Sequence, residues 1–272
     1  MSVFNFKKFS IKQDRSAMKV NTDGVLLGAW MHIKSDYRNF LDIGTGTGVI
    51  ALMCAQRYND GDFIDNKLSV AQSFKDEKTE IKKIEIDAID IDGNSIKDAR
   101  ENVKNSPWKD INVIETSLEN YIPNKYYDLI FTNPPYFSNS LKNTSLEKAA
   151  ARHNHSLSQS QIINSALKLL KHGGCLAIIL PSYEAREFIK KVEFISNSKS
   201  NKLLIISRLC SVSTTDKKVP KRIMMEFTAS KRDSQDNEII INSFSKEKLA
   251  ITTNGSYSEA YLKLTTTFYL NL

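Results

Sequence analysis

The chain has 272 residues, of which 41% are hydrophobic and 25% are charged, a composition typical of globular proteins in water. No apolar run reaches the roughly 20 residues that a membrane-spanning helix needs, and the first residues lack the apolar core of a signal peptide. We therefore expect a cytoplasmic protein with no membrane partner. Its three cysteines, Cys54, Cys175 and Cys210, lie far apart in apolar surroundings, which predicts buried, reduced thiols.

The net charge of +7 is distributed unevenly along the chain. Residues 1–22 hold five basic side chains and one acidic side chain, and residues 190–232 hold eleven basic and three acidic ones. A basic excess confined to two segments indicates a face that binds a polyanion. A solvated surface that keeps the protein soluble explains the charge equally well, so charge leaves both interpretations open.

Strand-like and helix-like patterns alternate through the middle of the chain. Short apolar runs predict strands, and amphipathic runs that stop near Ser, Pro or Gly predict helices. In chain order the patterns predict a strand at 40–43, a helix at 49–57, a strand at 84–91, a helix at 94–104, strands at 111–114 and 127–132, a helix at 158–171 closed by Gly173-Gly174, and a strand at 175–180. This alternation predicts an α/β fold in which helices cover both faces of a parallel sheet.

The remaining segments follow other patterns. Residues 202–213 and 222–229 are typical of two further strands, and residues 259–270 of a terminal helix. Residues 59–83 are polar and charged in both signs, which predicts an inserted surface loop. Because neither a repeat nor a second domain is evident, we expect residues 1–272 to form a single domain.

A glycine-rich turn, DIGTGTG, joins the first predicted strand to the next helix. Its glycines allow a tight turn and a close approach of a ligand to the backbone, and the helix N-terminus adds free N–H groups. Asp42 stands where a carboxylate could accept a bond from a ligand's ammonium group. This acid, and Val49 in place of the third glycine of GxGxxG, favour S-adenosylmethionine over a dinucleotide. A tight turn that binds nothing is the alternative. The glycines of the turn are Gly44, Gly46 and Gly48.

Asp90 closes the second predicted strand of the sheet. An acid at the carboxyl end of such a strand can accept bonds from both hydroxyls of a ribose. Asp92 falls on the same side by alternation and stays open as the alternative. Gly48 and Asp90 are 42 positions apart, about 20 more than usual, and the insert at 59–83 accounts for the excess.

The tetrapeptide Asn133-Pro-Pro-Tyr directly follows the strand predicted at 127–132. The exocyclic amino nitrogen of adenine is a poor nucleophile, because its lone pair delocalises into the ring. The Asn133 side-chain oxygen and the Pro134 carbonyl could accept its two N–H bonds and aim its lone pair at a methyl sulfonium. The prolines fix the backbone that carries these acceptors. Tyr136 offers a face for stacking, which Phe137 would extend. A plain turn with the same four residues is the alternative.

Together, the glycine turn, Asp90 and the NPPY motif resemble the class I amino-methyltransferases. The similarity extends to the bacterial methyltransferases that act at N6 of adenine-37 in tRNA(Val), through residues 9–30, 101–108, 133–137, 151–153, 257–261 and 268–270. The resemblance implies a Rossmann-like fold with a seven-stranded, mostly parallel mixed sheet, S-adenosyl-L-methionine as the cofactor and tRNA as the partner. It further implies that residues 1–35 cap the cofactor and that residues 182–272 complete the sheet.

The resemblance also assigns roles to particular residues around the cofactor. Ser117 stands where family members often place an Asp that bonds the cofactor adenine. Thr22 would close over the cofactor, although Thr22 and Asp23 also suit the N-cap of a helix at 24–33. The expected cofactor contacts are Lys19, Thr22, Asp42, Gly44, Gly46, Gly48, Asp90, Ser117 and Asn133.

The acceptor side receives a second set of assignments. Asn133, Pro134 and Tyr136 are the expected catalytic residues. The expected RNA contacts are Tyr136, Phe137, Arg152, Lys217, Lys218, Lys221 and Arg222. His153 and His155 lie close to Arg152, but with neither Cys nor a carboxylate in the motif we expect no metal site.

Four hypotheses of function follow from these motifs. N6-methylation of an adenine in tRNA explains the NPPY motif and the two basic segments. Protein N5-glutamine methylation of a release factor shares the motif, but those enzymes usually carry a helical domain before the core. DNA adenine methylation usually needs a target-recognition domain, so we expect no DNA partner. A Rossmann-like binding module leaves the NPPY motif unexplained. The chain is expected to act as a monomer.

Overall fold

The computed structural model describes residues 2–65, 83–135, 157–198, 201–232 and 244–270. Its strands are β1 (Val3–Asn5), β2 (Ser10–Lys12), β3 (Asn39–Ile43), β4 (Glu85–Asp90), β5 (Ile111–Glu115), β6 (Tyr127–Thr132), β7 (Leu170–Pro181), β8 (Lys202–Thr215), β9 (Arg222–Lys231), β10 (Ser245–Thr253) and β11 (Ser256–Tyr257). Its helices are α1 (Thr22–Trp30), α2 (Val49–Asn59), α4 (Gly93–Asn105), α6 (Gln159–Leu169), α7 (Ser182–Asn197) and α8 (Glu259–Thr265).

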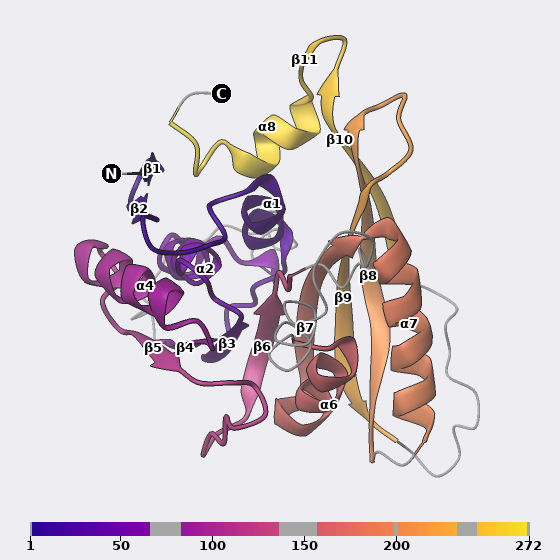
Figure 1. Ribbon diagram of the computed structural model, residues 1–272. Helices are drawn as coiled ribbons and strands as arrows, with labels where there is room; N and C mark the ends of the chain where they lie inside the picture. The colour runs from indigo at the N-terminus through magenta and orange to yellow at the C-terminus, as the bar shows by residue number, and fades with distance from the viewer. Residues whose placement is uncertain (1, 66–82, 136–156, 199–200, 233–243, 271–272) are drawn as a thin grey trace, which may run out of the picture.

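One mixed sheet organises the molecule (Figure 1). In the described ranges it has nine strands in the order β11-β10-β8-β9-β7-β6-β3-β4-β5, and β1 pairs with β2 in a separate hairpin. Strands β7, β6, β3, β4 and β5 run parallel, whereas β9 is antiparallel to both neighbours. The predicted α/β architecture is confirmed. Within the same ranges, each helix is too short or too polar to cross a membrane.

The predicted count of seven strands was too low. The sheet gains β10, which pairs in parallel with β8, and the two-residue β11 beyond it. The sequence of β10, SKEKLAITT, begins with charged residues that lie at the exposed rim, so it carries no apolar alternation over its first half. An outer strand of this kind has one neighbour fewer to pack against, and polar residues suit it.

Two other boundaries also differ from the predictions. Strand β7 starts at Leu170 and runs through Gly173 and Gly174, so the glycine pair lies inside a strand and not after a helix. A Cβ on Gly174 would lie 3.0 Å from the Tyr127 carbonyl oxygen, where β6 and β7 shift register. Helix α8 ends at Thr265 and does not reach Leu270, because β-branched threonines are poor helix formers.

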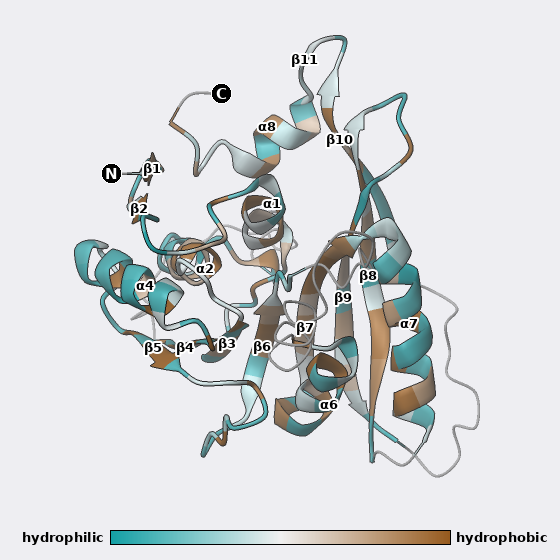
Figure 2. Ribbon diagram, viewed as in Figure 1, coloured by the Kyte–Doolittle hydropathy of each residue, from teal (hydrophilic) through white to brown (hydrophobic). Residues whose placement is uncertain are grey.

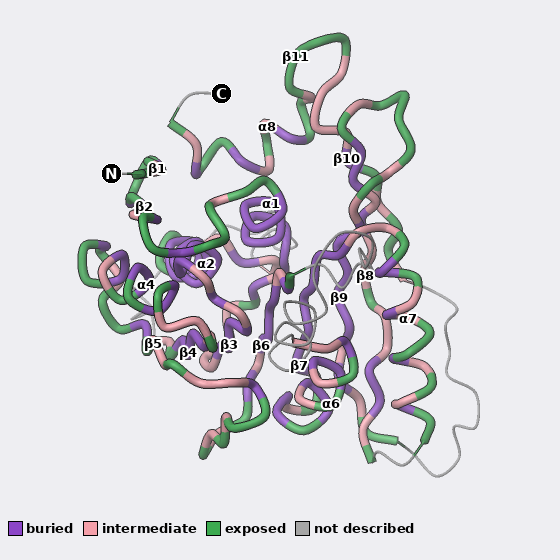
Figure 3. The backbone as a smooth tube through the Cα atoms, in the orientation of Figure 1, coloured by how far each residue is buried: buried purple, intermediate pink, exposed green. Residues whose placement is uncertain are grey.

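Apolar side chains fill two cores, one on each face of the sheet. Phe40, Leu129 and Phe131 contribute to the core under α1 and α2, whereas Leu41 and Ile130 contribute to the core under α6 and α7. This division follows from the alternation of side chains along a strand. Figures 2 and 3 show the result: the central strands are apolar and buried, and the outward side of α7 is polar and exposed.

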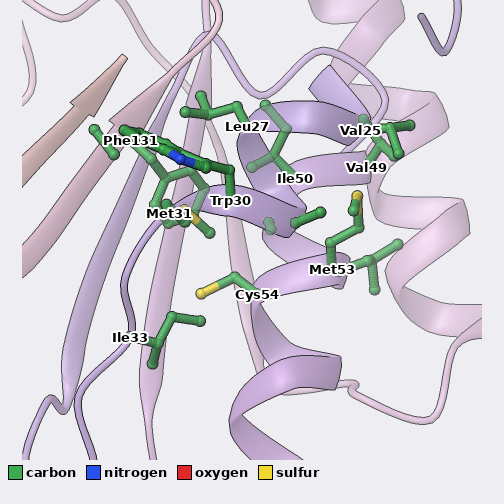
Figure 4. Close-up of a cluster of buried hydrophobic side chains, with 14 of the residues drawn as sticks. Val25, Leu27, Trp30, Met31, Ile33, Val49, Ile50, Met53, Cys54 and Phe131 are labelled. Carbon is green, nitrogen blue, oxygen red and sulfur yellow. The ribbon is translucent and has the colours of Figure 1, made fainter. Parts of the chain in front are cut away.

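Helix α2 is buried along almost its whole length and packs tightly against α1 (Figure 4). A Cβ on Gly28 of α1 would lie 2.9 Å from the Met53 sulfur and 3.2 Å from the Met53 Cβ, so a larger residue there would displace the Met53 side chain. Arg57 is also buried, and its guanidinium donates to the carbonyl oxygens of Gly28 (3.1 Å) and Met31 (2.6 Å). These contacts fix the position of α2, whose first residue follows the glycine-rich turn.

The N-terminal segment is anchored to α4 by a fully buried carboxylate. Asp98 accepts the backbone N–H groups of Arg15 and Ser16, both at 2.9 Å, and the Arg15 guanidinium at 2.8 Å. One helical turn on, Asn102 binds both backbone polar groups of Lys12 at 2.8 Å. Residues 12–16 are therefore held against α4 by backbone hydrogen bonds as well as by charge.

We expect Asp98→Ala to lower the free energy of unfolding by about 3 kcal/mol, because it leaves two backbone N–H groups without a partner. Urea denaturation of the purified variant measures this change. Asp110→Ala is the matched control, since the Asp110 side chain is 73% exposed and, among the described residues, is in an ion pair with the equally exposed Lys83 at 3.3 Å. Its effect should stay below about 0.5 kcal/mol. Equal losses in the two variants would contradict the anchoring role.

Candidate functional site

Three neighbouring parallel strands end at one edge of the sheet. Ile43 of β3 is level with Ile89 of β4 on one side and with Thr132 of β6 on the other. The Thr132 hydroxyl donates to the Ile43 carbonyl oxygen at 2.8 Å and fixes the two strand ends together. The residues that follow these strands, among them Gly44 and Asn133, therefore meet at the carboxyl edge of the sheet, where α/β sheets bind ligands.

A cavity of about 320 Å³ opens at this edge. Its walls include five of the residues that the sequence singled out for the cofactor, namely Gly44, Gly46, Asp90, Ser117 and Asn133. Its charged wall residues are Asp90, Asp92 and Glu119; among the described residues that line it there is no Lys and no Arg. The cavity is therefore acidic, and it suits a cationic ligand better than a pyrophosphate.

The glycine-rich turn presents its backbone to the cavity. Gly44 and Gly46 have φ angles of 70° and 56°, a left-handed conformation that costs glycine little. A Cβ built on either residue would meet no atom within 4 Å, so open space lies in front of the turn. The Gly44 and Thr45 amides donate to the Ile89 carbonyl oxygen at 2.9 and 3.0 Å, which holds the turn against the end of β4. Gly48 has a φ of 82° and starts α2 as its N-cap.

Asp90 and Asp92 have different surroundings. The Asp90 carboxylate accepts the Gly46 amide at 2.8 Å and the Asp92 amide at 2.9 Å, which aims it across the turn. Burial raises the pKa of the Asp90 carboxyl, although these two amides oppose the shift. Asp92 is the N-cap of α4, and its carboxylate accepts the Asn94 and Ser95 amides and the Ser95 hydroxyl. The capping bonds lower the pKa of Asp92.

Asp42 lies behind the glycine turn and not in the cavity. It is fully buried, its Oδ2 accepts the Thr45 hydroxyl at 2.7 Å, and its Oδ1 has no hydrogen-bond partner in the described structure. Burial raises the pKa of the Asp42 carboxyl to about 7; the Thr45 hydroxyl opposes this shift and the Asp90 carboxylate adds to it. In this arrangement Asp42 supports the turn from below, and its direct contact with a ligand ammonium stays a prediction.

Asn133 leaves β6 beside the start of α1. Its Nδ2 lies 3.5 Å from Oδ1 of Asn21, and the same Oδ1 accepts the Gly24 amide at 2.9 Å. Since that oxygen is an acceptor, the Asn133 amide presents its nitrogen to Asn21 and leaves its oxygen for another donor. Pro134 is buried and Pro135 lines the cavity. Asn21, not Thr22 or Asp23, is the N-cap of α1, so that prediction was wrong.

The N-terminal segment passes along the mouth of the cavity. Ala17 and Met18 line it, Ser16 bonds Ser95 through their hydroxyls at 2.8 Å, and the Lys19 ammonium donates to the Gln13 carbonyl oxygen. Lys19 and Thr22 are both exposed and lie outside the cavity wall. Ser117 lies in the wall, and its hydroxyl accepts the Asn120 amide at 3.2 Å.

The predicted RNA contacts divide into three groups. Tyr136, Phe137 and Arg152 lie outside the described residues, as do His153 and His155, at which no metal site was expected. Lys217, Lys218 and Lys221 are exposed on the turn between β8 and β9. Arg222 is in an ion pair with Asp23, in which the Nε to Oδ2 distance is 2.6 Å, so this side chain ties β9 to α1.

Comparisons with known proteins agree with this architecture. A family model described as "Eco57I restriction-modification methylase" matches residues 9–210. A tRNA1(Val) (adenine(37)-N6)-methyltransferase from Trichodesmium erythraeum is 38% identical over 98% of this chain and 97% of its own length. One with the same name from Pseudoalteromonas translucida is 34% identical over the whole of both chains. The chain belongs to the family of tRNA1(Val) (adenine(37)-N6)-methyltransferases.

Solved structures support the fold of this family member. A predicted O-methyltransferase from Agrobacterium tumefaciens superposes with a TM-score of 0.59 and 13% identity, covering 90% of this chain and 96% of the other. Pyrococcus horikoshii TYW2 in complex with MeSAdo gives a TM-score of 0.52 and 12% identity, over 85% and 72% of the two chains. The class I methyltransferase fold expected from the sequence is thus confirmed.

Several residues that line the cavity lie outside the motifs from which the site was predicted. Ile91 is 48% and Met18 44% exposed, and both line the cavity together with the buried Leu118. Ile91 stands between two acids directly after a strand, a placement that could have marked it, and the N-cap preference for Asn could have marked Asn21. Met18 reaches the cavity only because Asp98 anchors the segment before it, which local sequence does not show. No group of three metal-ligating side chains occurs in the part of the chain that the structure describes.

The raised pKa of Asp42 predicts a pH-dependent stability. The Asp42 carboxyl has a pKa of about 7 in the folded protein, whereas in the unfolded chain its pKa is the ordinary 3.8 of an aspartate. Between these values the folded state binds more protons, so the free energy of unfolding decreases as the pH rises. Asp42→Asn removes this contribution. When melting temperatures are measured from pH 4 to 8, the difference between the variant and the native chain should therefore shift in favour of the variant as the pH rises.

Asp110→Asn serves as the control for this titration. The Asp110 carboxylate is 73% exposed, so its removal should alter the pH dependence of the melting temperature little. A constant difference between Asp42→Asn and the native chain at every pH would contradict a raised pKa at Asp42.

Proposed function

We propose that this chain transfers a methyl group from S-adenosylmethionine to N6 of an adenine in tRNA, with adenine-37 of tRNA(Val) as the target. The observation that carries the proposal is the position of Asn133, which shares one cavity with the glycine turn and Asp90. The names of the full-length relatives support the same reaction and substrate, and MeSAdo in a neighbour of the same fold supports the cofactor.

The cavity fits S-adenosylmethionine in shape and charge. The open face of Gly44 and Gly46 would receive the methionine part, and the half-buried Asp90 carboxylate would accept the ribose hydroxyls. Asp92 is engaged as a helix cap, which favours Asp90 for the ribose. Ile91 and Leu118 offer apolar surfaces to the adenine ring, and Ser117 a hydroxyl at its edge. The acidic wall suits the cationic sulfur. Residues 12–22 would cap the bound cofactor, with Met18 facing it.

The chain's own part in the reaction is alignment. S-adenosylmethionine, when bound, supplies a methyl group activated by its positively charged sulfur. Asn21 holds the Asn133 amide so that Oδ1 of Asn133 is free to accept an N–H of the target adenine. The Pro134 carbonyl would accept the second N–H, and the amino lone pair would then face the cofactor. Neither step requires a metal or a strong base: methyl transfer would leave a strongly acidic protonated amine, whose proton would pass to water, and the cofactor would depart as the neutral thioether.

The exposed lysines of the β8–β9 turn would bind the tRNA backbone. Lys217, Lys218 and Lys221 lie at the carboxyl edge of the sheet, since β9 begins opposite the end of β7 at Pro181. Tyr136, Phe137 and Arg152 remain predictions for the target base and its neighbours.

Asn133→Ala should abolish N6-methyladenosine formation, with the rate falling at least about 100-fold because one aligned acceptor is lost. S-adenosylmethionine binding should stay within a few fold. Mass spectrometry of tRNA nucleosides tests both the function and the residue: a strain that lacks the gene should lose the modification at position 37, the native gene should restore it, and the variant should not.

Asn105→Ala is the control, because Asn105 is exposed at the far end of α4, and it should restore the modification fully. If tRNA from the deletion strain keeps its N6-methyladenosine while glutamine methylation of a release factor disappears, the protein acceptor replaces the tRNA.

The triple substitution Lys217→Glu, Lys218→Glu and Lys221→Glu should weaken tRNA binding and make it less dependent on salt. Each lost phosphate contact reduces the slope of log K against log salt by about 0.7 for single-stranded nucleic acid. Titrations of tRNA between about 50 and 200 mM salt measure the slope. The same reversal at Lys104, Lys109 and Lys168, which are exposed at the opposite edge of the sheet, is the control. An unchanged slope in the first variant would remove the turn from the tRNA interface.

A further inference from the structure

Tyr183 and Val219 are two exposed apolar residues at the carboxyl edge of the sheet. Tyr183, in the first turn of α7, is 75% exposed, and Val219, at the tip of the β8–β9 turn, is 80% exposed. Both lie outside the cavity, and neither belongs to a core cluster. Large side chains exposed singly are ordinary, but an exposed aromatic ring beside a basic turn is a typical feature of surfaces that bind single-stranded nucleic acid.

Hydrogen bonds join the start of α7 to the β8–β9 turn. The Ser182 amide donates to the Lys221 carbonyl oxygen at 3.1 Å, and the Ser182 hydroxyl donates to the Pro220 carbonyl oxygen at 2.7 Å. The turn is itself closed by the Lys221 amide, which donates to the Val212 carbonyl oxygen at 2.9 Å. Tyr183 therefore projects from a helix whose first residue is bonded directly to the basic turn.

The same region is tied to the acceptor site. Arg222 follows the turn directly and pairs with Asp23 of α1 at 2.6 Å. Two residues earlier, Asn21 contacts Asn133 at the cavity. Hydrogen bonds and one ion pair thus connect the start of α7, through the β8–β9 turn and α1, to Asn133.

The charges around Tyr183 identify the partner. The side chains of Lys217, Lys218, Lys221 and Arg186 are exposed, and none of them makes an ion pair within the described ranges. Asp216 is the one acid of the turn that joins β8 to β9. Unpaired cations around an aromatic face attract phosphates and stack a base at the same place.

We propose that Tyr183, with Val219 beside it, stacks an unpaired base of the tRNA that neighbours the target adenine, while the surrounding lysines bind the adjoining phosphates. This inference rests on the proposed function, of which it names the substrate-binding surface. Bases of RNA loops are splayed out of the helix and accessible to such a ring.

The test compares two equally exposed aromatic residues on one helix. Tyr183→Ala should weaken binding of transcribed tRNA(Val) about ten-fold and raise its KM by a similar factor, because the stacking face is lost. S-adenosylmethionine affinity, melting temperature and the salt slope of tRNA binding should stay unchanged. Tyr183→Phe keeps the ring and should bind within two-fold of the native chain. Phe194→Ala is the matched control, since Phe194 is 74% exposed near the other end of α7.

Native-like tRNA binding by Tyr183→Ala, or an equal loss in Phe194→Ala, would overturn the proposal. A loss in Tyr183→Phe as large as that in Tyr183→Ala would also overturn it, because the hydroxyl would then be the contact. Failure of the proposed function looks different: the native chain would methylate tRNA no faster than Asn133→Ala does. If the native chain methylates tRNA and Tyr183→Ala changes nothing, only the stacking surface is rejected.

Discussion

The parallel register of β3 between β4 and β6 is the constraint on which the site depends. Because Ile43 is level with Ile89 and Thr132, the residues that follow these three strands all lie at one edge of the sheet. The Gly46 amide then reaches the Asp90 carboxylate at 2.8 Å and joins the turn of one strand to the acid of the next. A slip of one residue would turn the side chains to the opposite faces of the sheet and separate these groups.

Helix α1 contacts both Asn133 and the start of β9, which the strand register alone does not bring together. Its cap, Asn21, lies against Asn133, and its first turn holds Arg222 through Asp23. The segment before it is anchored to α4 by Asp98, which brings Met18 to the cavity mouth. Helix α1, packed closely on α2, thereby fixes where Asn133 lies relative to the cavity and to the basic β8–β9 turn.

The sequence predicted the features that depend on local chemistry. The glycine turn, the strand-end Asp90 and the position of Asn133 after β6 need only neighbouring residues and the order of strands. The burial of Asp42 and the ion pair of Arg222 were not predictable, because each depends on a partner from a distant element. Strand β10 was missed since its first half is charged. The sequence also gave no reason to select Tyr183, whose exposure depends on how α7 meets the β8–β9 turn.

Charge is arranged in opposite senses inside and outside the cavity. Three carboxylates line it, and Asp42 lies buried beneath it, where mutual repulsion with Asp90 contributes to a raised pKa. A cationic ligand relieves this repulsion, whereas a phosphate entering the cavity would add to it. The lysines of the β8–β9 turn, in contrast, attract a polyanion. In the proposed function this arrangement would favour an RNA backbone at the rim and disfavour it in the cavity, so that a neutral base would reach Asn133 while its phosphates stay outside.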